Sequence, residues 1–409
     1  MTMTHNFHSI LLSHARRYPE TQPTDLLKLI HQNVFGSGHL APSPEIVCKR
    51  LADEFASCDK TEPFVEMLGE CSRVYIGSAV PVSDSDSAGS DCRGTNDKII
   101  ENIIDKIDGF ENRPADERLL EIIARLFILT ADRFPCDYAH ADENSRSRLN
   151  ECINTAREVV RDGCFGFGID EFDPAVAEFT AAGYPAQSHS DAYRNTYKPA
   201  YRVVDSYFAR LISCLYAISR LLDEKSGQVR IVIDGRAASG KTTAAELIAG
   251  YFSGAYQREF PDTRNVTTDI IHADDFFLPP SLRTPERLNE TGGNLHRERF
   301  YDEIIKNLDS PDGFSYRVFD CSKMDYAPEP RKIKPCRLLI FEGAYSLHPD
   351  FGDYFDLAIF SDISPDEQSR RILSRNGERM LKRFEQEWIP MEEKYFDGFK
   401  IRQKCKITI

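Results

Sequence analysis

The chain has 409 residues, of which 41% are hydrophobic and 28% charged, and its formal net charge at pH 7 is −14. This length exceeds what one hydrophobic core usually holds, so we expect two domains. The negative charge argues against a nucleic-acid partner, because such binding depends on neutralising phosphates. No apolar run is long enough to cross a membrane, so no membrane partner is expected. The N-terminus lacks the regions of a signal peptide, and eleven scattered cysteines without a C-x-x-C pair are typical of a reduced, cytoplasmic protein.

The pattern of apolar residues predicts a mainly helical domain over residues 1–222. The sequence leaves the role of this domain open. Apolar residues recur at helical spacing in four stretches, which indicates amphipathic helices over 7–17, 96–107, 114–130 and 145–161. Another helix is expected from Thr24, a suitable N-cap residue. Residues 73–77 are expected to form a short strand, and residues 203–222 one long amphipathic helix.

Residues 183–202 are the most polar and aromatic stretch of this domain. Tyr193, Tyr197 and Tyr201 are spaced four residues apart, but Pro199 interrupts a single helix, so two short segments are expected. Two interpretations stay open: a binding surface for an anionic or ring-containing ligand, or the seam where the two domains pack. The seam is slightly preferred, because interfaces are enriched in tyrosine and arginine.

The strongest motif of the chain lies between a strand and a helix. A β-branched apolar run over 229–233 predicts a buried strand, and the residues after Lys241 favour a helix. Between them, residues 235–242 fit G-x-x-x-x-G-K-[ST] at every fixed position, which predicts a loop that cradles a triphosphate with its amides. Lys241 would place a positive charge on the phosphates, and Thr242 would offer its hydroxyl to Mg²⁺. We therefore expect ATP and Mg²⁺ as cofactors, with nucleotide-binding residues Gly235, Arg236, Ala237, Ala238, Ser239, Gly240, Lys241, Thr242 and Thr243.

Further strands alternate with helices in residues 227–409. Short apolar runs predict strands over 268–273, 338–341 and 357–360, and a last strand is expected at 405–409. This alternation predicts an α/β fold with a parallel sheet covered by helices on both faces. In such sheets the site lies at the carboxyl ends of the strands. Three of these ends carry acidic residues, namely Asp274 with Asp275, Glu342, and Asp362.

Phosphoryl transfer needs a metal ion beside the phosphates and a group that takes the proton of the attacking hydroxyl. Glu342 is the candidate support for the metal, and Asp274 is the candidate general base. Asp275 is a second candidate metal ligand that could share either role. Each strand-end acid could alternatively be solvated or cap a helix. The basic stretch 370–383 would by default be a solvated surface, but beside a triphosphate Arg371 or Arg375 could clamp the transferring group.

The second domain resembles the uridine kinase and phosphoribulokinase group of P-loop kinases, on residues 234–243, 273–277, 341–349 and 364–373. The resemblance implies that Asp274 is the general base and that the arginine-rich segment is a lid. Two departures concern the acceptor. Nucleoside kinases of this group usually have Asp-Ser where this chain has Asp274-Asp275, and their lid pattern differs from Arg375-Asn376-Gly377-Glu378-Arg379. The segments 292–300 and 316–320 occupy the expected acceptor region and supply His296 and Asp320 as candidate contacts.

The whole chain is similar to bacterial uridine-kinase-like proteins that share segments like 26–39 and 189–202. We therefore expect a helical domain over 1–222 followed by a P-loop NTPase domain over 227–409. The hypothesis is ATP- and Mg²⁺-dependent phosphorylation of a hydroxyl on a small metabolite, such as a uridine-like nucleoside or a sugar. If the first domain caps the active site, further acceptor contacts are His189, Arg194 and Arg202. The alternatives are a nucleotide-dependent switch with little turnover and a simple ATPase, and homo-oligomerisation stays open.

Overall fold

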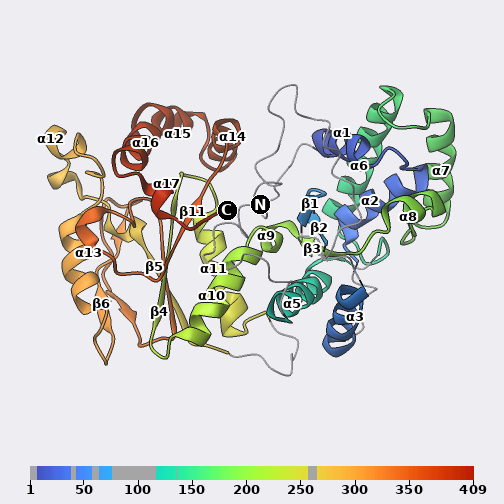
Figure 1. Ribbon diagram of the computed structural model, residues 1–409. Coiled ribbons are helices and arrows are strands. Elements are labelled where there is room, and N and C mark those ends of the chain that lie inside the picture. The colour runs from blue at the N-terminus through green and yellow to red at the C-terminus, as the bar shows by residue number, and fades with distance from the viewer. Residues whose placement is uncertain (1–6, 38–42, 58–63, 76–116, 136, 257–264) are drawn as a thin grey trace. The chain divides into compact units, whose positions relative to one another are not determined.

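The computed structural model describes residues 7–37, 43–57, 64–75, 117–135, 137–256 and 265–409 (Figure 1). The chain forms two compact units, Met1–Ile212 and Ser213–Ile409. The helix predicted over 96–107 lies outside the described residues. Every helix in the described ranges is too short or too polar to cross a membrane.

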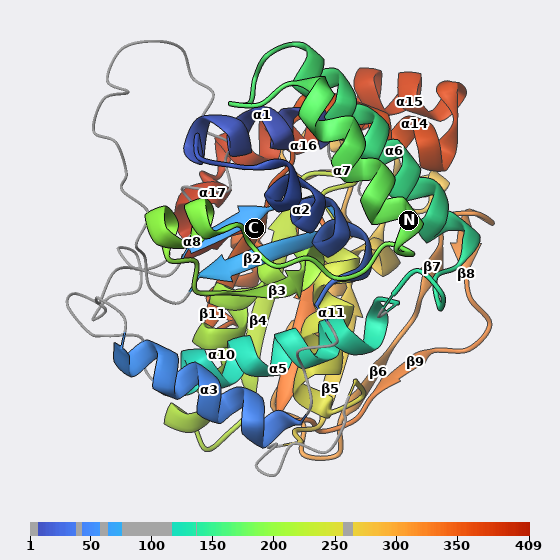
Figure 2. The same cartoon turned by 90° about the vertical axis from the view of Figure 1, so that its right-hand side faces the viewer.

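Unit 1 is mainly helical. Helices α1, α2, α6 and α7 pack on one another (Figure 2). Their leucine, isoleucine and phenylalanine side chains form one buried core. Asp142 caps α6 by accepting a hydrogen bond from the Ser145 N–H, which fixes where that helix begins. The helices of unit 1 are α1 (Phe7–Arg17), α2 (Pro23–Phe35), α3 (Pro44–Ser57), α5 (Glu117–Arg133), α6 (Glu143–Arg161), α7 (Ile169–Ala181), α8 (Asp191–Tyr197) and α9 (Ser206–Ala209).

Unit 1 also contains an antiparallel sheet in the order β1-β2-β3, formed by Phe64–Met67, Cys71–Tyr75 and Tyr201–Asp205. The strand expected near residue 73 is confirmed as β2. The single long helix predicted over 203–222 is wrong: Val203 and Val204 are buried in β3, where they pair with Arg73 and Ser72. Asp205 ends the strand and accepts from the Tyr207 N–H, so α9 begins there. The apolar spacing of this stretch fits a helix as well as a strand, and only pairing with β2 decides between them.

Unit 2 is built on a parallel sheet in the order β12-β11-β4-β10-β5. The central strand β4 (Val229–Gly235) lies between β11 (Leu357–Ser361) and β10 (Leu338–Glu342), and β5 (Thr268–His272) flanks β10. The edge strand β12 (Ile407–Thr408) pairs with β11. The predicted strands are thus confirmed, and their carboxyl ends share one edge of the sheet.

Helices cover both faces of this sheet (Figure 1). Val232, Phe341 and Phe360 point to the face that carries a large apolar core with side chains of α13, α16 and α17. Helix α11 packs on β4, β5 and β10. A parallel sheet between helices, with the glycine-rich loop joining its central strand to the next helix, is the α/β P-loop NTPase fold. The helices of unit 2 are α10 (Ile212–Glu224), α11 (Lys241–Ser253), α12 (Pro285–Leu288), α13 (Arg297–Glu303), α14 (Pro365–Asn376), α15 (Glu378–Arg383), α16 (Ile389–Gly398) and α17 (Ile401–Lys404).

Two small hairpins and a helical irregularity complete unit 2. Strands β6 (Phe314–Tyr316) and β9 (Arg331–Ile333) pair with each other, as do β7 (Phe319–Asp320) and β8 (Asp325–Tyr326). A π-helical turn, Phe384–Trp388, joins α15 to α16. Pro390 is the second residue after this turn and has no N–H to donate back to it, which explains why the regular helical bonding is interrupted here.

Candidate active site

The phosphate loop connects β4 to α11, and its two motif glycines have separate structural reasons. Gly235 has φ +141, and a Cβ atom there would lie 2.1 Å from the Ser361 carbonyl oxygen of β11. Gly240 has φ +93 and is the N-cap residue of α11. A side chain at either position would meet a backbone clash or a strained backbone. The loop geometry therefore requires both glycines of the motif.

Lys241 and Thr242 begin α11 at the end of this loop. The Lys241 Nζ donates to the carbonyl oxygens of Gly235 at 2.9 Å and Arg236 at 2.8 Å, so the ammonium closes the loop on itself. The Thr242 hydroxyl donates to Glu342 Oε1 at 3.2 Å. These contacts bring Lys241, Thr242 and Glu342 to one place, as the motif and the strand end predict. Thr243 is exposed on the next position of the helix.

Glu342 ends β10 and is buried, with 4% of its surface exposed. The register of the sheet places it opposite Ile233 of β4 and His272 of β5. The His272 Nδ1 lies 2.5 Å from Glu342 Oε1, and this hydrogen bond raises the pKa of His272. His272 is a site residue that sequence reasoning missed. A histidine two residues before Asp274, at the end of the predicted strand, was the available signal.

Asp274 and Asp275 follow β5 in a short 3₁₀ turn, Ala273–Phe276. Desolvation by the surrounding protein is the main cause that raises the pKa of Asp274 to about 6, and the negative charge of Glu342 is the second. The side chain nevertheless remains exposed, so solvent screens part of this effect. Asp275 is engaged elsewhere: the Tyr316 hydroxyl donates to its Oδ2 at 2.8 Å, and its backbone oxygen accepts from Arg299. The two neighbouring acids therefore have different surroundings.

The two candidate clamp arginines on α14 also differ. Arg371 donates from Nη1 to the Ala238 carbonyl oxygen of the phosphate loop at 3.1 Å, and its Nε pairs with Glu367 at 2.7 Å. Arg375 is exposed and donates to the Asn376 side chain. The structure thus brings Arg371 to the loop, whereas the contact of Arg375 is with its own neighbour.

Helix α16 reaches the phosphate loop through two consecutive acids that sequence reasoning missed. Glu392 Oε2 accepts from the Ala237 N–H at 2.9 Å, and Glu393 pairs with Arg236 at 2.9 Å. Glu392 occupies the apolar stripe that Tyr395 and Phe396 continue, and all three are buried. A charged residue on the apolar side of a helix was the signal that could have found it.

The candidate acceptor contacts in unit 2 have local structural partners. His296 is the N-cap residue of α13 and its ring accepts from the Arg299 N–H at 3.3 Å. Asp320 accepts from Ser322 and pairs with Lys323 at 2.8 Å, contacts that hold its pKa well below the usual range. Neither residue has a described contact with the phosphate loop.

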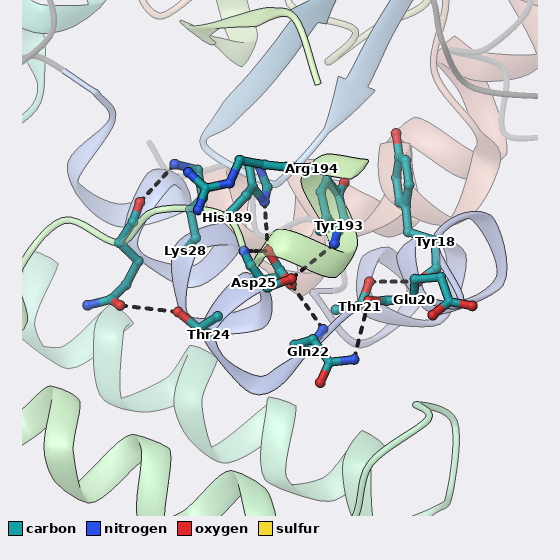
Figure 3. Close-up of polar contacts among 12 residues, drawn as sticks. Tyr18, Glu20, Thr21, Gln22, Thr24, Asp25, Lys28, His189, Tyr193 and Arg194 are labelled. Atoms are coloured by element: carbon teal, nitrogen blue, oxygen red, sulfur yellow. Dashed lines mark hydrogen bonds and ion pairs between the residues drawn. The ribbon is translucent and has the colours of Figure 1, made fainter. Parts of the chain in front are cut away.

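The three candidate acceptor contacts in unit 1 have different partners and different exposure. His189 is buried, and its Nδ1 lies 2.8 Å from Asp25 (Figure 3). Its Nε2 lies 2.7 Å from the Tyr201 hydroxyl, so both ring nitrogens have partners. Arg194 is exposed and pairs with Asp191, and Arg202 pairs with Glu54. These contacts give all three predicted residues structural roles within unit 1.

Two of the tyrosines of residues 183–202, for which a seam or a binding surface was expected, contribute to the interior of unit 1. Tyr193 and Tyr197 are buried against Tyr18 in unit 1's own interior. The expected division into two segments is confirmed, because α8 ends at Tyr197 and β3 begins at Tyr201. Tyrosine rings at helical spacing belong to a core here, because Tyr193 and Tyr197 of α8 pack against Tyr18, the residue that follows α1.

His189 and Tyr201 belong to a larger polar network inside unit 1. Arg73 of β2 is fully buried, and its guanidinium donates to Glu66 at 3.3 Å and to Gln32 at 3.0 Å. The Gln32 side chain also donates a hydrogen bond to the Tyr201 hydroxyl, and the His14 Nδ1 lies 2.9 Å from Glu66 Oε1. Burial lowers the pKa of His14 and lowers that of His189 to about 4, so both rings are neutral at pH 7. Three buried atoms of this region lack a hydrogen-bond partner in the described chain: Arg73 Nη2, His14 Nε2 and the Tyr193 hydroxyl.

The residues at the loop suit a magnesium ion. Thr242 and Glu342 offer oxygen ligands, which Mg²⁺ prefers, and these oxygens lie 3.2 Å apart. Within the described ranges, no group of three or more His, Cys, Asp or Glu side chains could hold a metal. Magnesium bound here would therefore take the rest of its ligands from phosphate oxygens and water, as is usual beside nucleotides.

Comparison with known proteins gives structural neighbours only. No protein-family model matches the chain, and no curated protein matches its sequence. A possible uridine kinase from Bacillus stearothermophilus is similar in structure, with 14% identity and a TM-score of 0.35 over 47% of this chain and 96% of the other. A candidate fructose transport system kinase from Silicibacter sp. TM1040 is also similar, with 19% identity and a TM-score of 0.38 over 48% and 98%.

Proposed function

We propose that the protein transfers a phosphoryl group from Mg-ATP to a hydroxyl of a small metabolite, such as a uridine-like nucleoside or a sugar. The observation that carries this proposal is the meeting of three strand ends. The loop after β4 supplies Lys241 and Thr242, β10 supplies Glu342, and Asp274 follows β5. A phosphate site, a metal-binding carboxylate and an acid with raised pKa at one sheet edge are the parts that phosphoryl transfer needs.

The phosphates are held by the loop amides and by Lys241, which would exchange its two loop carbonyl partners for phosphate oxygens. Thr242 and Glu342 are the proposed metal-binding residues. Asp275 is the weaker candidate, because its carboxylate already accepts from Tyr316. Bound magnesium would neutralise charge on the phosphates.

Asp274 is the proposed general base. Its pKa of about 6 keeps it ionised at pH 7 while making it a stronger proton acceptor than an ordinary aspartate. It would take the proton of the acceptor hydroxyl as that oxygen attacks the γ-phosphorus and the bond to ADP breaks. Arg371 is the proposed clamp on the transferring group, because it already contacts the loop at Ala238.

The test is ADP release from Mg-ATP by the full chain against a panel of nucleosides, sugars and other small alcohols. Lys241→Ala is the blank, since it removes the charge on the phosphates. Stimulation by one acceptor class, absent in the blank, supports the proposal. Nucleotide binding without stimulation by any acceptor contradicts it and favours a nucleotide-dependent switch. Equal turnover without any acceptor would instead point to an ATPase.

A further inference from the structure

A buried carboxylate lies directly against the phosphate loop. Glu392 has 7% of its surface exposed, and its Oε2 accepts from the Ala237 N–H at 2.9 Å. This amide belongs to the loop that we propose holds the triphosphate. A carboxylate at that amide places negative charge beside the phosphates and repels them. Ionised Glu392 therefore opposes nucleotide binding.

Moving Glu392 away from the loop would break several contacts at once. The Ala237 carbonyl oxygen accepts from Gln368 of α14 at 3.0 Å, so both backbone groups of this residue are held by helices. The next residue on α16, Glu393, pairs with Arg236 at 2.9 Å. Protonation of Glu392 removes its charge and leaves one oxygen free to accept from Ala237. It is the change that disturbs the fewest contacts.

The charges around Glu392 suit such a protonation. Burial is the main cause that raises the pKa of Glu392 to about 7. Lys241 opposes this rise, while Asp274 and Asp234 add to it. Tyr345 also lies within electrostatic reach, and the neighbouring Glu393 is neutralised by Arg236. A triphosphate brought to the loop adds negative charge and favours the protonated form further.

We propose that Glu392 is a proton-linked residue of the nucleotide site, which takes up a proton from solvent when Mg-ATP binds. The inference rests on the proposed function, because it assumes that the loop binds a triphosphate. The proton comes from the buffer, and no other bond forms or breaks in this step. Nucleotide affinity thereby falls as the pH rises, since the ionised carboxylate must first be protonated.

The test uses the full chain, Mg²⁺ and the slowly hydrolysed analogue ATPγS. Calorimetry at pH 8 in buffers of different ionisation enthalpy counts the protons taken up on binding, and titrations between pH 6 and 9 give Kd. Glu392→Gln keeps the size and the acceptor for Ala237 but cannot titrate. Glu385→Gln, an exposed acid in the π-helical turn of the same helical run, is the matched control.

For the wild type and Glu385→Gln, we expect uptake near one proton at pH 8 and a Kd that rises by up to about tenfold per pH unit above 7. For Glu392→Gln, we expect little uptake, a flat Kd over this range and tighter binding than the wild type at pH 8. Asp274→Asn should keep the uptake, which separates Glu392 from the other acid of raised pKa.

Equal uptake and equal pH dependence in the wild type and Glu392→Gln would overturn the inference while leaving the proposed function standing. Weaker binding by Glu392→Gln with the pH dependence retained would also overturn it, and would make Glu392 a support of the loop. If the wild type binds no nucleotide at any pH, as Lys241→Ala is expected to do, the proposed function and the inference fall together.

Discussion

Two groups of charged side chains, one in each unit, show opposite organisation. In unit 1, Arg73 is matched by Glu66, and Asp25 accepts from His189 and Ser190. In unit 2, Glu342, Asp274 and Glu392 lie around one phosphate loop with Lys241 as the nearby cation. Glu342 is also bonded to His272, so the three acids share two basic neighbours. A network of matched partners fixes a structure, whereas acids that outnumber the cations beside them are typical of sites where charge must change.

The same difference reverses how each unit responds to pH. Burial lowers the pKa of His14 and His189 in unit 1, so the unfolded chain binds these protons more readily than the folded one. Burial raises the pKa of Glu392 in unit 2, so there the folded chain binds the proton more readily. Through these groups, acidification from neutral pH should destabilise unit 1 and stabilise unit 2.

The largest effect is expected from Asp274→Asn, which removes the proposed general base from the group of acids in unit 2. Turnover with the acceptor found in the panel should fall by about 10²–10⁴-fold, because asparagine cannot take the proton. Nucleotide Kd should change little, and the check is kcat and Kd measured on the same preparation. In the wild type, turnover should rise with pH through about 6, as Asp274 becomes ionised. A collapse of ATP affinity would instead place Asp274 in the metal site.

The phosphate loop and the strand-end acids could be predicted because they follow from local pattern and from the geometry of parallel sheets. A β-branched run, a glycine-rich turn and a helix place Lys241 and Thr242 without knowledge of any distant residue. Register in a parallel sheet then carries Glu342 to the same edge. These are the parts of the site that the structure assembles as expected.

Contacts between distant residues could not be predicted in this way. Ala237 and Glu392 are 155 positions apart. The local pattern marks Glu392 as a charged residue on an apolar stripe, but it does not identify Ala237 as the partner. Val203 and Val204 fit a helix or a strand equally well until β2 lies beside them. Tyr193 and Tyr197 fit an interface or a core until Tyr18 is known to cover them.

The next largest effect is expected in unit 1, from Arg73→Met. The change leaves Glu66 buried without its cation, which typically costs about 3–5 kcal/mol in the free energy of unfolding. Nucleotide affinity measured below the transition should stay unchanged, because the residue belongs to the network of unit 1. Urea unfolding followed by circular dichroism gives the measurement. Arg194→Met, at an exposed pair with Asp191, is the matched control and should cost about 0–1 kcal/mol.

The opposite pH responses can be separated because Trp388, the single tryptophan, lies in unit 2. His189 has a folded pKa of about 4 against 6.5 unfolded, so unit 1 should lose on the order of 3 kcal/mol between pH 6.5 and 4. Glu392 has a folded pKa of about 7 against 4.5 unfolded, so its contribution to the stability of unit 2 should rise by a similar amount as the pH falls from 7 to 4.5.

Tryptophan fluorescence should therefore report a transition that moves to higher urea at pH 5 than at pH 7. Circular dichroism also reports the unfolding of unit 1. The part of its change that fluorescence does not follow should move to a lower urea concentration at pH 5 than at pH 7. Glu392→Gln should flatten the fluorescence response alone. Movement of both transitions in the same direction would contradict opposite pH responses of the two units.

A smaller effect is expected from the two arginines of α14. Arg371→Ala should lower kcat/KM about tenfold, because it removes the guanidinium that contacts the Ala238 carbonyl oxygen beside the proposed γ-phosphate position. Arg375→Ala should change kcat/KM less than about twofold, because its side chain is exposed and bonds to Asn376. Steady-state kinetics on both variants tests the order, and a larger loss in Arg375→Ala would reverse the assignment of the clamp.

The smallest effect distinguishes satisfied from unsatisfied hydroxyls inside the unit 1 network. The Tyr197 hydroxyl accepts from the Glu20 N–H at 2.9 Å, so Tyr197→Phe should cost about 0.5–1.5 kcal/mol of unfolding free energy. The buried Tyr193 hydroxyl lacks a partner in the described chain, so Tyr193→Phe should be neutral or slightly stabilising. Urea unfolding at pH 7 gives both values. If Tyr193→Phe instead costs as much as Tyr197→Phe, the Tyr193 hydroxyl has a hydrogen-bond partner in solution, such as an ordered water. The polar network of unit 1 would then have more of its groups hydrogen-bonded than its side chains alone provide.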